Sequence, residues 1–417
     1  MTPDDFPTPE TDVETVSPDA LKERVDADAD LTILDARMHS EYDEWHIDDE
    51  SVTSINVPYF EFLDDEIDAD VLGRIPDDRT VTVLCAKGGA SEFVAGALAD
   101  RGYEVNHLED GMNGWASIYE RVRVSNYDGP GTLYQYQRPS SGCLGYLLVD
   151  GDEAAIVDPL RAFTDRYRDD AEELGAALTY AFDTHIHADH LSGVRALHGS
   201  GSSRTGRSDG DRDFDHDLDG EGVEGVIPAA AVDRGVTYAD ELTTAADGDT
   251  FAVGDATIEA VYTPGHTTGM TSYLIGDSLL ATGDGLFVES VARPDLEEGD
   301  EGAPDAARTL YDSLQTRVLS LPSDTLVGGA HYSDVAEPAG DGTYTATIGE
   351  LKAQMAALTM DEDDFVELIL SDMPPRPANY EEIIATNLGQ HAVDDEAFTL
   401  ELGPNNCAAS HESLAGD

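Results

Sequence analysis

The sequence has very little positive charge. Its 417 residues include three lysines and 23 basic residues in all, against 87 acidic residues, which gives a formal net charge of −64. Acidic residues occur in every segment, so the surface is predicted to repel itself in dilute buffer and to be screened by concentrated salt. This balance predicts a cytoplasmic protein of a halophile. It argues against nucleic acids and anionic membranes as partners.

Cysteines and long apolar runs are also scarce. The three cysteines, Cys85, Cys143 and Cys407, are odd in number and far apart, so no disulfide framework is predicted and a reducing compartment fits. Cys143 is interpreted as a packing residue beside a strand, and Cys407 as part of a tail. No apolar run approaches the roughly 20 residues of a membrane-spanning helix. The first residues lack the basic and apolar segments of a signal peptide.

The chain is long enough for two or more domains. Residues 1–12 are acidic and rich in proline, which is typical of a loose tail. Over residues 13–124, short apolar strands alternate with helical segments, which predicts a parallel α/β domain. Residues 130–375 form a second predicted domain, and residues 376–417 a C-terminal extension. Within the second domain, residues 199–225 contain almost nothing apolar, which predicts a disordered surface insertion.

Apolar runs and their periodicity locate the main secondary-structure elements. The strands are predicted at residues 31–34, 81–84, 105–108, 145–149, 154–157, 176–182, 278–280 and 325–327. The helices are predicted at residues 91–101, 190–197 and 380–388.

The most concentrated polar pattern lies between a predicted buried strand and a predicted helix. It contains His185, His187, Asp189 and His190 within six positions. Neutral imidazole and carboxylate groups are the ligands of catalytic zinc and non-haem iron. A run of ordinary surface residues is the alternative, but such a cluster has no evident use in packing. The sequence therefore predicts a metal site on this strand-to-helix turn.

Three distant positions extend this pattern. His266 closes a Thr-Pro-Gly-His turn, Asp284 follows a Thr-Gly pair after a strand, and His331 follows Gly-Gly-Ala after another strand. Each lies beside glycines, which let the backbone approach a common point. We therefore expect these three side chains to meet the histidine cluster around a shared metal.

The order of these motifs (HxHxDH, TPGH, GD and GAH) resembles the metallo-β-lactamase fold superfamily over roughly residues 130–375. The resemblance implies an αββα sandwich with the metal at one edge of two sheets. Residues 141–146, 157–159 and 291–295 narrow it to the glyoxalase II and persulfide dioxygenase branch. Residues 373–377 and 385–389 are similar to a C-terminal pattern of rhodanese-fused persulfide dioxygenases.

The resemblance to persulfide dioxygenases implies that this chain binds one Fe(II), held by His185, His266 and Asp284. This two-histidine, one-carboxylate set leaves open positions for oxygen and a sulfur substrate, and Arg293 is expected to contact that substrate. In glyoxalase II, the same motif positions hold two metals around a hydroxide that hydrolyses a thioester. One or two Zn²⁺ is therefore the alternative. The remaining motif residues are His187, Asp189, His190 and His331. In a dioxygenase they would orient the ligands and waters, and in a hydrolase they would hold the second metal.

The first domain resembles rhodanese over roughly residues 13–124. Cys85 ends a strand and begins a glycine-containing loop that runs into a helix. Backbone amides of such a loop and the helix N-terminus would lower the thiol pKa and stabilise a persulfide anion. A buried structural cysteine is the alternative. Rhodanese loops commonly carry an arginine where this chain has Ala90, and Lys87 is expected to supply the missing charge.

Together the two resemblances imply an iron-dependent persulfide dioxygenase that oxidises a low-molecular-weight thiol persulfide to sulfite. The rhodanese domain would act as a sulfurtransferase that handles sulfane sulfur. One alternative is a zinc-dependent hydrolase of the glyoxalase II type, with a small-molecule thioester as substrate. Another is a rhodanese domain that only senses sulfur or docks a partner. Relatives commonly form dimers, so a homodimer is also expected.

Overall fold

The structure is a computed structural model that describes residues 11–64, 66–199, 222–333, 335–371, 373–393, 397–403 and 406–409. The chain divides into two compact units, one mainly of residues up to Tyr119 and the other mainly from Glu120 onward. The predicted tail over residues 1–12 lies almost wholly outside the described residues, and so does most of the predicted insertion. Glu224 and Gly225, at the end of that insertion, already belong to a strand.

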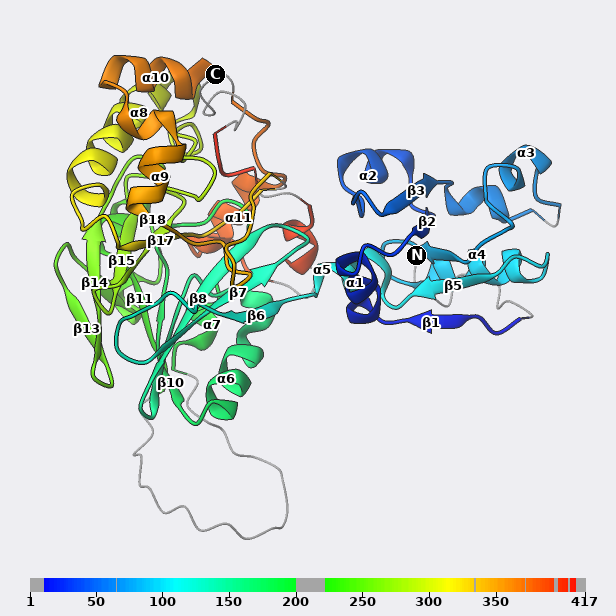
Figure 1. The fold of residues 1–417 in the computed structure, drawn as a ribbon, viewed down its shortest axis with the longest axis horizontal. Coiled ribbons are helices and arrows are strands. Elements are labelled where there is room, and N and C mark those ends of the chain that lie inside the picture. The colour runs from blue at the N-terminus through cyan, green and yellow to red at the C-terminus, as the bar shows by residue number, and fades with distance from the viewer. Residues whose placement is uncertain are drawn as a thin grey trace, which may run out of the picture. The chain divides into compact units, whose positions relative to one another are not determined.

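The first unit is a parallel α/β sheet in the strand order β1-β5-β4-β2-β3 (Figure 1). The predicted strands at 31–34, 81–84 and 105–108 are confirmed. The predicted helix begins two residues earlier than expected, at Gly89. The strands are β1 (Glu14–Val16), β2 (Leu31–Asp35), β3 (Val52–Asn56), β4 (Val81–Leu84) and β5 (Val105–Leu108). The helices are α1 (Pro18–Asp26), α2 (His39–Glu44), α3 (Ala69–Leu72), α4 (Gly89–Ala99) and α5 (Gly111–Ala116).

Both faces of this sheet are covered by apolar side chains, as expected for a parallel sheet. On one face, Val83 packs in a core with Val94 of α4. On the other, Leu84 packs in a core with Met112 and Trp115 of α5. The alternation of Val83 and Leu84 between the two cores follows from the two-residue period of a strand. Cys85 then leaves the sheet at the carboxyl end of β4.

The second unit contains two mixed sheets, in the orders β12-β11-β10-β9-β8-β7-β6 and β13-β14-β15-β16-β17-β18. The strands of the first sheet are β6 (Glu120–Arg123), β7 (Thr132–Arg138), β8 (Cys143–Asp150), β9 (Glu153–Val157), β10 (Ala177–Phe182), β11 (Glu224–Pro228) and β12 (Thr243–Ala245). The strands of the second are β13 (Thr250–Val253), β14 (Ala256–Tyr262), β15 (Thr271–Ile275), β16 (Leu279–Gly283), β17 (Leu326–Gly329) and β18 (Ala346–Thr347). The helices are α6 (Thr164–Glu173), α7 (Val194–Leu197), α8 (Gly299–Ser313), α9 (Ile348–Gln354), α10 (Glu362–Ser371) and α11 (Tyr380–Asn387).

The two sheets pack face to face over an apolar core. Phe182 of β10 and Tyr273 of β15 meet across it with ring centroids 5.0 Å apart. A second core lies on the other face of the second sheet, where Leu310 of α8 and Phe365 of α10 pack against Val327. Helices α8 to α10 cover this sheet and α6 packs on β10 (Figure 1). The αββα sandwich is confirmed. None of the helices in the described part of the chain is long and apolar enough to cross a membrane.

The strand ends position the predicted ligands. Strands β16 and β17 are parallel neighbours, so their carboxyl ends meet at one edge, just before Asp284 and near His331. Strand β10 is parallel to β9 and β11 and ends at Phe182, just before the histidine cluster. The predicted helix at 190–197 is shorter than expected and begins at Val194. In place of its first predicted turn, Ser192 forms a β-bridge with Leu160, and the backbone amides of residues 191 and 192 donate to the side chains of Glu401 and Asn387.

Candidate metal centre

His185, His266 and Asp284 face one another in the interior of the second unit. Nε2 of His185 lies 3.5 Å from Oδ2 of Asp284, and Nε2 of His266 lies 3.4 Å from the same oxygen. All three side chains are buried, and within the described residues none of these three atoms has a hydrogen-bond partner. Leaving buried polar atoms without partners is costly, and a shared cation would satisfy all three. The residues therefore fit a metal ion.

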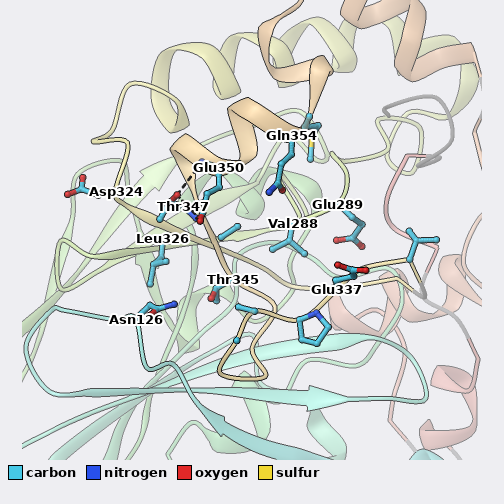
Figure 2. A pocket seen from close by; sticks show the side chains of 16 residues that line it. Asn126, Val288, Glu289, Asp324, Leu326, Glu337, Thr345, Thr347, Glu350 and Gln354 are labelled. Carbon is cyan, nitrogen blue, oxygen red and sulfur yellow. Dashed lines mark hydrogen bonds between the residues drawn. The ribbon is translucent and has the colours of Figure 1, made fainter. Parts of the chain in front are cut away.

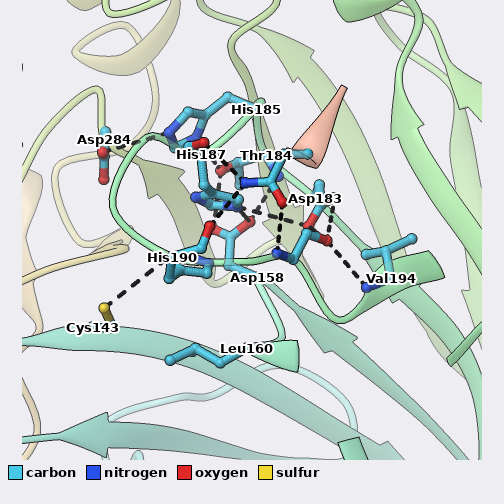
Figure 3. Close-up of polar contacts among 12 residues, drawn as sticks. Cys143, Asp158, Leu160, Asp183, Thr184, His185, His187, His190, Val194 and Asp284 are labelled. Atoms are coloured by element: carbon cyan, nitrogen blue, oxygen red, sulfur yellow. Dashed lines mark hydrogen bonds and ion pairs between the residues drawn. The ribbon is translucent and has the colours of Figure 1, made fainter. Parts of the chain in front are cut away.

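A hydrogen-bond chain fixes the orientation of His185. The hydroxyl of Thr184 donates to Oδ2 of Asp158 at 3.0 Å. Its oxygen can therefore accept from Nδ1–H of His185, 2.9 Å away. With the proton on Nδ1, the lone pair of Nε2 faces Asp284 (Figure 3). Metal-binding histidines typically donate their other N–H to a partner that fixes the ring, and here that partner is Thr184, held by the carboxylate of Asp158.

His266 is oriented by the backbone of Arg293. Nδ1–H of His266 donates to the Arg293 carbonyl oxygen at 3.0 Å, which leaves Nε2 free of its proton. The Arg293 guanidinium is itself buried. It donates to Asp295 and to three carbonyl oxygens, those of Pro374, Pro375 and Asn406. The contacts of Arg293 thus hold protein segments together, and its expected contact with substrate stays a prediction.

The protonation states of this set suit a cation. Burial lowers the pKa of His185 to about 3, with the charge of His187 adding to the effect. Burial likewise lowers the pKa of His266. For Asp284, burial acts to raise the pKa, but His331 and His185 outweigh it and hold the pKa well below its ordinary value. Two neutral imidazoles and a carboxylate anion are therefore present at neutral pH, as metal binding requires.

His187 is directed elsewhere. Its Nε2 lies 3.2 Å from Oδ1 of Asp158 and 3.7 Å from Oδ1 of Asp183, two buried carboxylates (Figure 3). Burial and the neighbouring His190 lower the pKa of His187, but the carboxylates outweigh them and raise it to about 9. His187 thus forms a separate buried group with Asp158 and Asp183.

His331 links two carboxylates. Its Nδ1 lies 2.6 Å from Oδ1 of Asp284, and its Nε2 lies 2.6 Å from Oδ2 of Asp189. Oδ2 of Asp189 also lies 3.0 Å from Nδ1 of His190. Burial lowers the pKa of His331, but the two carboxylates outweigh it and raise the pKa well above its ordinary value. Asp189, His190 and His331 therefore form a group of their own. His331 connects this group to the set of His185, His266 and Asp284 through its contact with Asp284.

The C-terminal part of the chain supports the histidine loop. The side-chain amide of Asn387 donates to the carbonyl oxygens of His187 and His190, at 3.0 and 2.8 Å. The carboxylate of Glu401 accepts from the amide of Leu191 at 2.8 Å. These contacts give the 385–389 motif a physical role, because they hold the backbone from which the cluster projects.

Two cysteines belong to this centre, which the sequence analysis did not predict. Cys143 is buried with Asp189, His190 and His331, and Cys407 is buried with Asp284 and His331. The interpretation of Cys407 as tail is wrong, because the next residue, Ala408, forms a β-bridge with Ala292. No local sequence pattern predicts that the segment around Cys407 pairs with residue 292, more than a hundred residues earlier. For Cys143, its place at the start of a strand in a family motif was the available signal.

Cys85 in the first unit lies at the edge of an apolar core, beside a turn held by backbone hydrogen bonds. It is 5% exposed, and its Sγ lies 3.5 Å from Oγ of Ser91. The amide of Met112 donates to the Cys85 carbonyl oxygen at 2.7 Å. Gly111, at φ 55°, lies so close that a Cβ there would be 2.0 Å from this oxygen. Lys87 is exposed. The predicted roles of Cys85 and Lys87 stay predictions.

A pocket of about 650 Å³ lies elsewhere in the second unit (Figure 2). Its lining contains none of the metal-centre residues described above. Four carboxylates line it, those of Glu289, Asp324, Glu337 and Glu350. An anionic substrate would be repelled there, so this pocket is not a candidate site for a persulfide anion.

Comparisons with known proteins agree with this architecture. The family model of the metallo-beta-lactamase superfamily matches residues 140–331, and that of the rhodanese-like domain matches residues 17–118. The human mitochondrial persulfide dioxygenase ETHE1 is 28% identical over 64% of this chain and 93% of its own length. A probable metallo-hydrolase of Burkholderia pseudomallei is 30% identical over 57% of this chain and 84% of its own length. The structure of a metallo-beta-lactamase from Staphylococcus aureus superimposes with a TM-score of 0.51 at 25% identity, covering 63% of this chain and 74% of that one.

Proposed function

The chain belongs to the metallo-β-lactamase superfamily and carries a rhodanese-like domain, and we propose that this enzyme is an iron-dependent persulfide dioxygenase. The substrate is a low-molecular-weight thiol persulfide. One persulfide, one O₂ and one water give one thiol, one sulfite and two protons. The sulfur–sulfur bond breaks, the outer sulfur is oxidised to sulfite, and O₂ is reduced.

The observation that carries this proposal is the three-donor set His185, His266 and Asp284. Its donor atoms face one another without hydrogen-bond partners in the described part of the chain, while His187 points to a separate pair of carboxylates. Two imidazoles and one carboxylate are the ligands of non-haem iron oxygenases, and they leave adjacent positions open. The human relative named persulfide dioxygenase, which this chain covers over 93% of its length, supports the same chemistry.

The roles of the chain's own residues follow from their contacts. Thr184 and the carbonyl of Arg293 hold the protons of His185 and His266 on Nδ1, so that both Nε2 atoms are donors. His331 donates from Nδ1 to Oδ1 of Asp284, which keeps Oδ2 turned toward the imidazoles. When bound, iron would supply neighbouring coordination positions for the substrate sulfur and O₂, and a route for electrons from that sulfur to O₂.

The first unit would handle sulfane sulfur. In this role the thiolate of Cys85 takes the outer sulfur of a donor, releases the donor as a thiolate, and passes the sulfur on. The loop after β4 and the N-terminus of α4 would stabilise the resulting persulfide anion, as backbone amides do for other anions. The rhodanese-like family match over residues 17–118 supports this role.

A zinc-dependent thioester hydrolase is the second candidate. It is favoured by the metallo-hydrolase relative and by the group of Asp189, His190 and His331 beside Asp284. A binuclear hydrolase would draw its nucleophilic hydroxide from between two metals. The two candidates therefore differ in metal count, in metal identity and in the need for O₂.

The test is metal analysis of the full chain purified anaerobically in high salt, paired with O₂ uptake on addition of a thiol persulfide. High salt is chosen because it screens the repulsion expected from a net charge of −64. We expect about one iron per chain and persulfide-dependent O₂ uptake. Two zinc ions per chain without O₂ uptake would contradict the proposal, and thioesters would then be the substrates to assay.

A further inference from the structure

We propose that Asn387, the last residue of α11, is a positioning residue for the metal ligand His185. Its side chain holds the backbone of the loop that carries this histidine, and it acts on the ion only through that loop. The inference rests on the proposed function in one respect, because it takes His185, His266 and Asp284 as the ligand set. It assigns part of the metal affinity to a residue outside that set.

The loop between β10 and α7 has little backbone support of its own. At its start, the amide of Thr271 donates to the carbonyl oxygen of Thr184 at 2.9 Å, and at its end, the amide of Arg161 donates to that of Leu191 at 2.8 Å. Between these two points, within the described part of the chain, residues 185–190 form no backbone–backbone hydrogen bond. The conformation of these six residues therefore depends on side chains from other segments.

Asn387 makes three such contacts from one side chain. Its Nδ2 donates to the carbonyl oxygens of His187 and His190, at 3.0 and 2.8 Å, and its Oδ1 accepts from the amide of Ser192 at 3.0 Å. Asn387 is only 6% exposed. A carbonyl oxygen can only accept and a backbone amide can only donate, so these partners determine which end of the carboxamide faces which group. The side chain therefore fits the loop in one orientation.

Apolar contacts on both sides of Asn387 pack α11 and the residue after it against the same loop. Near the start of the loop, Ile186 packs in one buried cluster with Leu388. At its end, Leu191 packs in another with Ile383 of α11. All four of these side chains are buried. Because the surroundings of the carboxamide are apolar, loss of its N–H groups would leave two buried carbonyl oxygens without a donor.

The end of α11 is itself held in place. The buried hydroxyl of Tyr238 donates to the carbonyl oxygen of Asn387 at 2.5 Å, and the amide of Thr237 donates to that of Leu388 at 2.9 Å. These bonds fix the backbone of Asn387, while its side chain fixes the loop. The carboxamide is thus a rigid link between the loop and the segment that contains Thr237 and Tyr238.

The consequence for the metal is geometric. A ligand must be held within roughly 0.5 Å of its productive position. Thr184 orients the ring of His185, but Asn387 holds the backbone from two residues further on. Without that anchor, the imidazole would have to be ordered each time an ion binds, and the affinity would fall. Outer partners of metal ligands typically account for about 10- to 100-fold in affinity, and we place Asn387 at the lower end because it acts through the backbone.

The test compares Asn387→Leu with the matched control Thr386→Val, both in the full chain and in high salt. Leucine keeps the branching of asparagine but removes its three hydrogen bonds to the loop. Thr386 is also buried in α11, and its hydroxyl donates to the carbonyl oxygen of Glu382 in the same helix. Competition with a chelator gives the affinities for Fe(II) and for Zn²⁺. We expect both ions to bind about tenfold or more weakly in Asn387→Leu, and to change by less than about twofold in Thr386→Val.

A spectroscopic measurement separates positioning from a general loss of stability. The visible d–d bands of the first equivalent of bound Co²⁺ report the arrangement of its ligands. We expect these bands to shift in Asn387→Leu and to stay unchanged in Thr386→Val. Asn387→Ala, which removes the carboxamide without adding bulk, should change affinity and bands in the same direction, and it replaces the leucine variant if that one does not fold.

Two outcomes would overturn the proposal: unchanged metal affinity in a folded Asn387 variant, or weaker affinity with unchanged Co²⁺ bands, which would make the residue merely structural. None of these measurements uses O₂ or a persulfide. A native chain without persulfide-dependent O₂ uptake would contradict the proposed function and leave this inference standing, so the two failures are distinguishable.

Discussion

The Cys85 loop and the metal centre are built in opposite ways. At Cys85, backbone hydrogen bonds join the short stretch after β4 to the start of α5, and apolar side chains pack beside the thiol. The metal centre draws buried side chains from segments as far apart as Cys143 and Cys407. One site is set by the path of a loop, and the other by the packing of two sheets.

This difference determines how each site responds to change. Replacing the thiol of Cys85 should leave this loop in place because its backbone hydrogen bonds remain, although Gly111 has no room for a side chain. The metal centre is a network of buried polar groups, in which removal of one member leaves others unsatisfied at a cost. Substitutions should therefore act on chemistry alone in the first unit, and on metal binding and stability together in the second.

The largest effect is expected from Asp284→Asn. The substitution replaces the one anionic ligand of the first set, and its amide nitrogen faces two unprotonated imidazole nitrogens or His331. We expect loss of bound iron and a fall in kcat/KM for O₂ uptake of at least about 100-fold, or roughly 2.7 kcal/mol. Iron content and oxygen-electrode rates measure it, with Asp305→Asn as a control at an exposed carboxylate. Retained iron with full activity would remove Asp284 from the ligand set.

The next effect separates the two units. Cys85→Ser should abolish transfer of sulfane sulfur to a thiol acceptor, because the hydroxyl cannot carry a persulfide. O₂ uptake with a low-molecular-weight persulfide should change by less than about twofold, since the metal ligands lie in the other unit. Parallel assays of both reactions measure this. Unchanged sulfur transfer would instead favour a docking or sensing role for the first unit.

Thr184→Val tests the hydrogen-bond chain that orients His185. Valine keeps the shape of threonine but removes the hydroxyl that lies between Asp158 and Nδ1 of His185. Loss of such an outer partner typically weakens metal affinity about 10- to 100-fold. Competition with a chelator measures the affinity. Thr179→Val is the matched control, because its hydroxyl donates only to the carbonyl of Ala154 on β9 among the bonds the structure records for it.

The smallest effect on metal binding is expected from His187→Gln. The structure directs His187 to Asp158 and Asp183, so iron should be retained and O₂ uptake reduced by less than about tenfold. Breaking a buried ion pair should still lower the melting temperature, with a cost of about 3–5 kcal/mol at most. Comparison with His185→Gln, which should lose iron, shows whether His187 is an iron ligand. Equal iron loss in both variants would make His187 a ligand of the same metal and contradict the proposed set.

Periodicity in the sequence was sufficient to locate several strands and the polar residues that follow them. The strands before Cys85, His185 and Asp284 were predictable because each is a short apolar run that ends abruptly. The two sheets were not predictable from periodicity alone, and the αββα arrangement came from the resemblance to a family.

What could not be predicted depends on contacts between distant segments. The thiol of Cys407 reaches the centre because residues 406–409 pair with the loop at 291–293. The direction of His187 depends on Asp158, which is distant in the sequence, and on Asp183, four residues earlier, and no motif predicts that the imidazole turns to them. The segment before α7 likewise depends on distant residues, because its amides at 191 and 192 donate to Glu401 and Asn387.

The proposed function requires that this metal centre perform oxygen chemistry with iron. The most direct measurement compares two aliquots of one metal-free preparation, one loaded with Fe(II) under anaerobic conditions and the other with Zn²⁺. Both receive a thiol persulfide, and O₂ consumed and sulfite formed are counted. The account predicts one O₂ consumed and one sulfite formed per persulfide in the iron aliquot, and neither in the zinc aliquot. Thioester hydrolysis by the zinc aliquot, with no O₂ uptake by the iron aliquot, would contradict it.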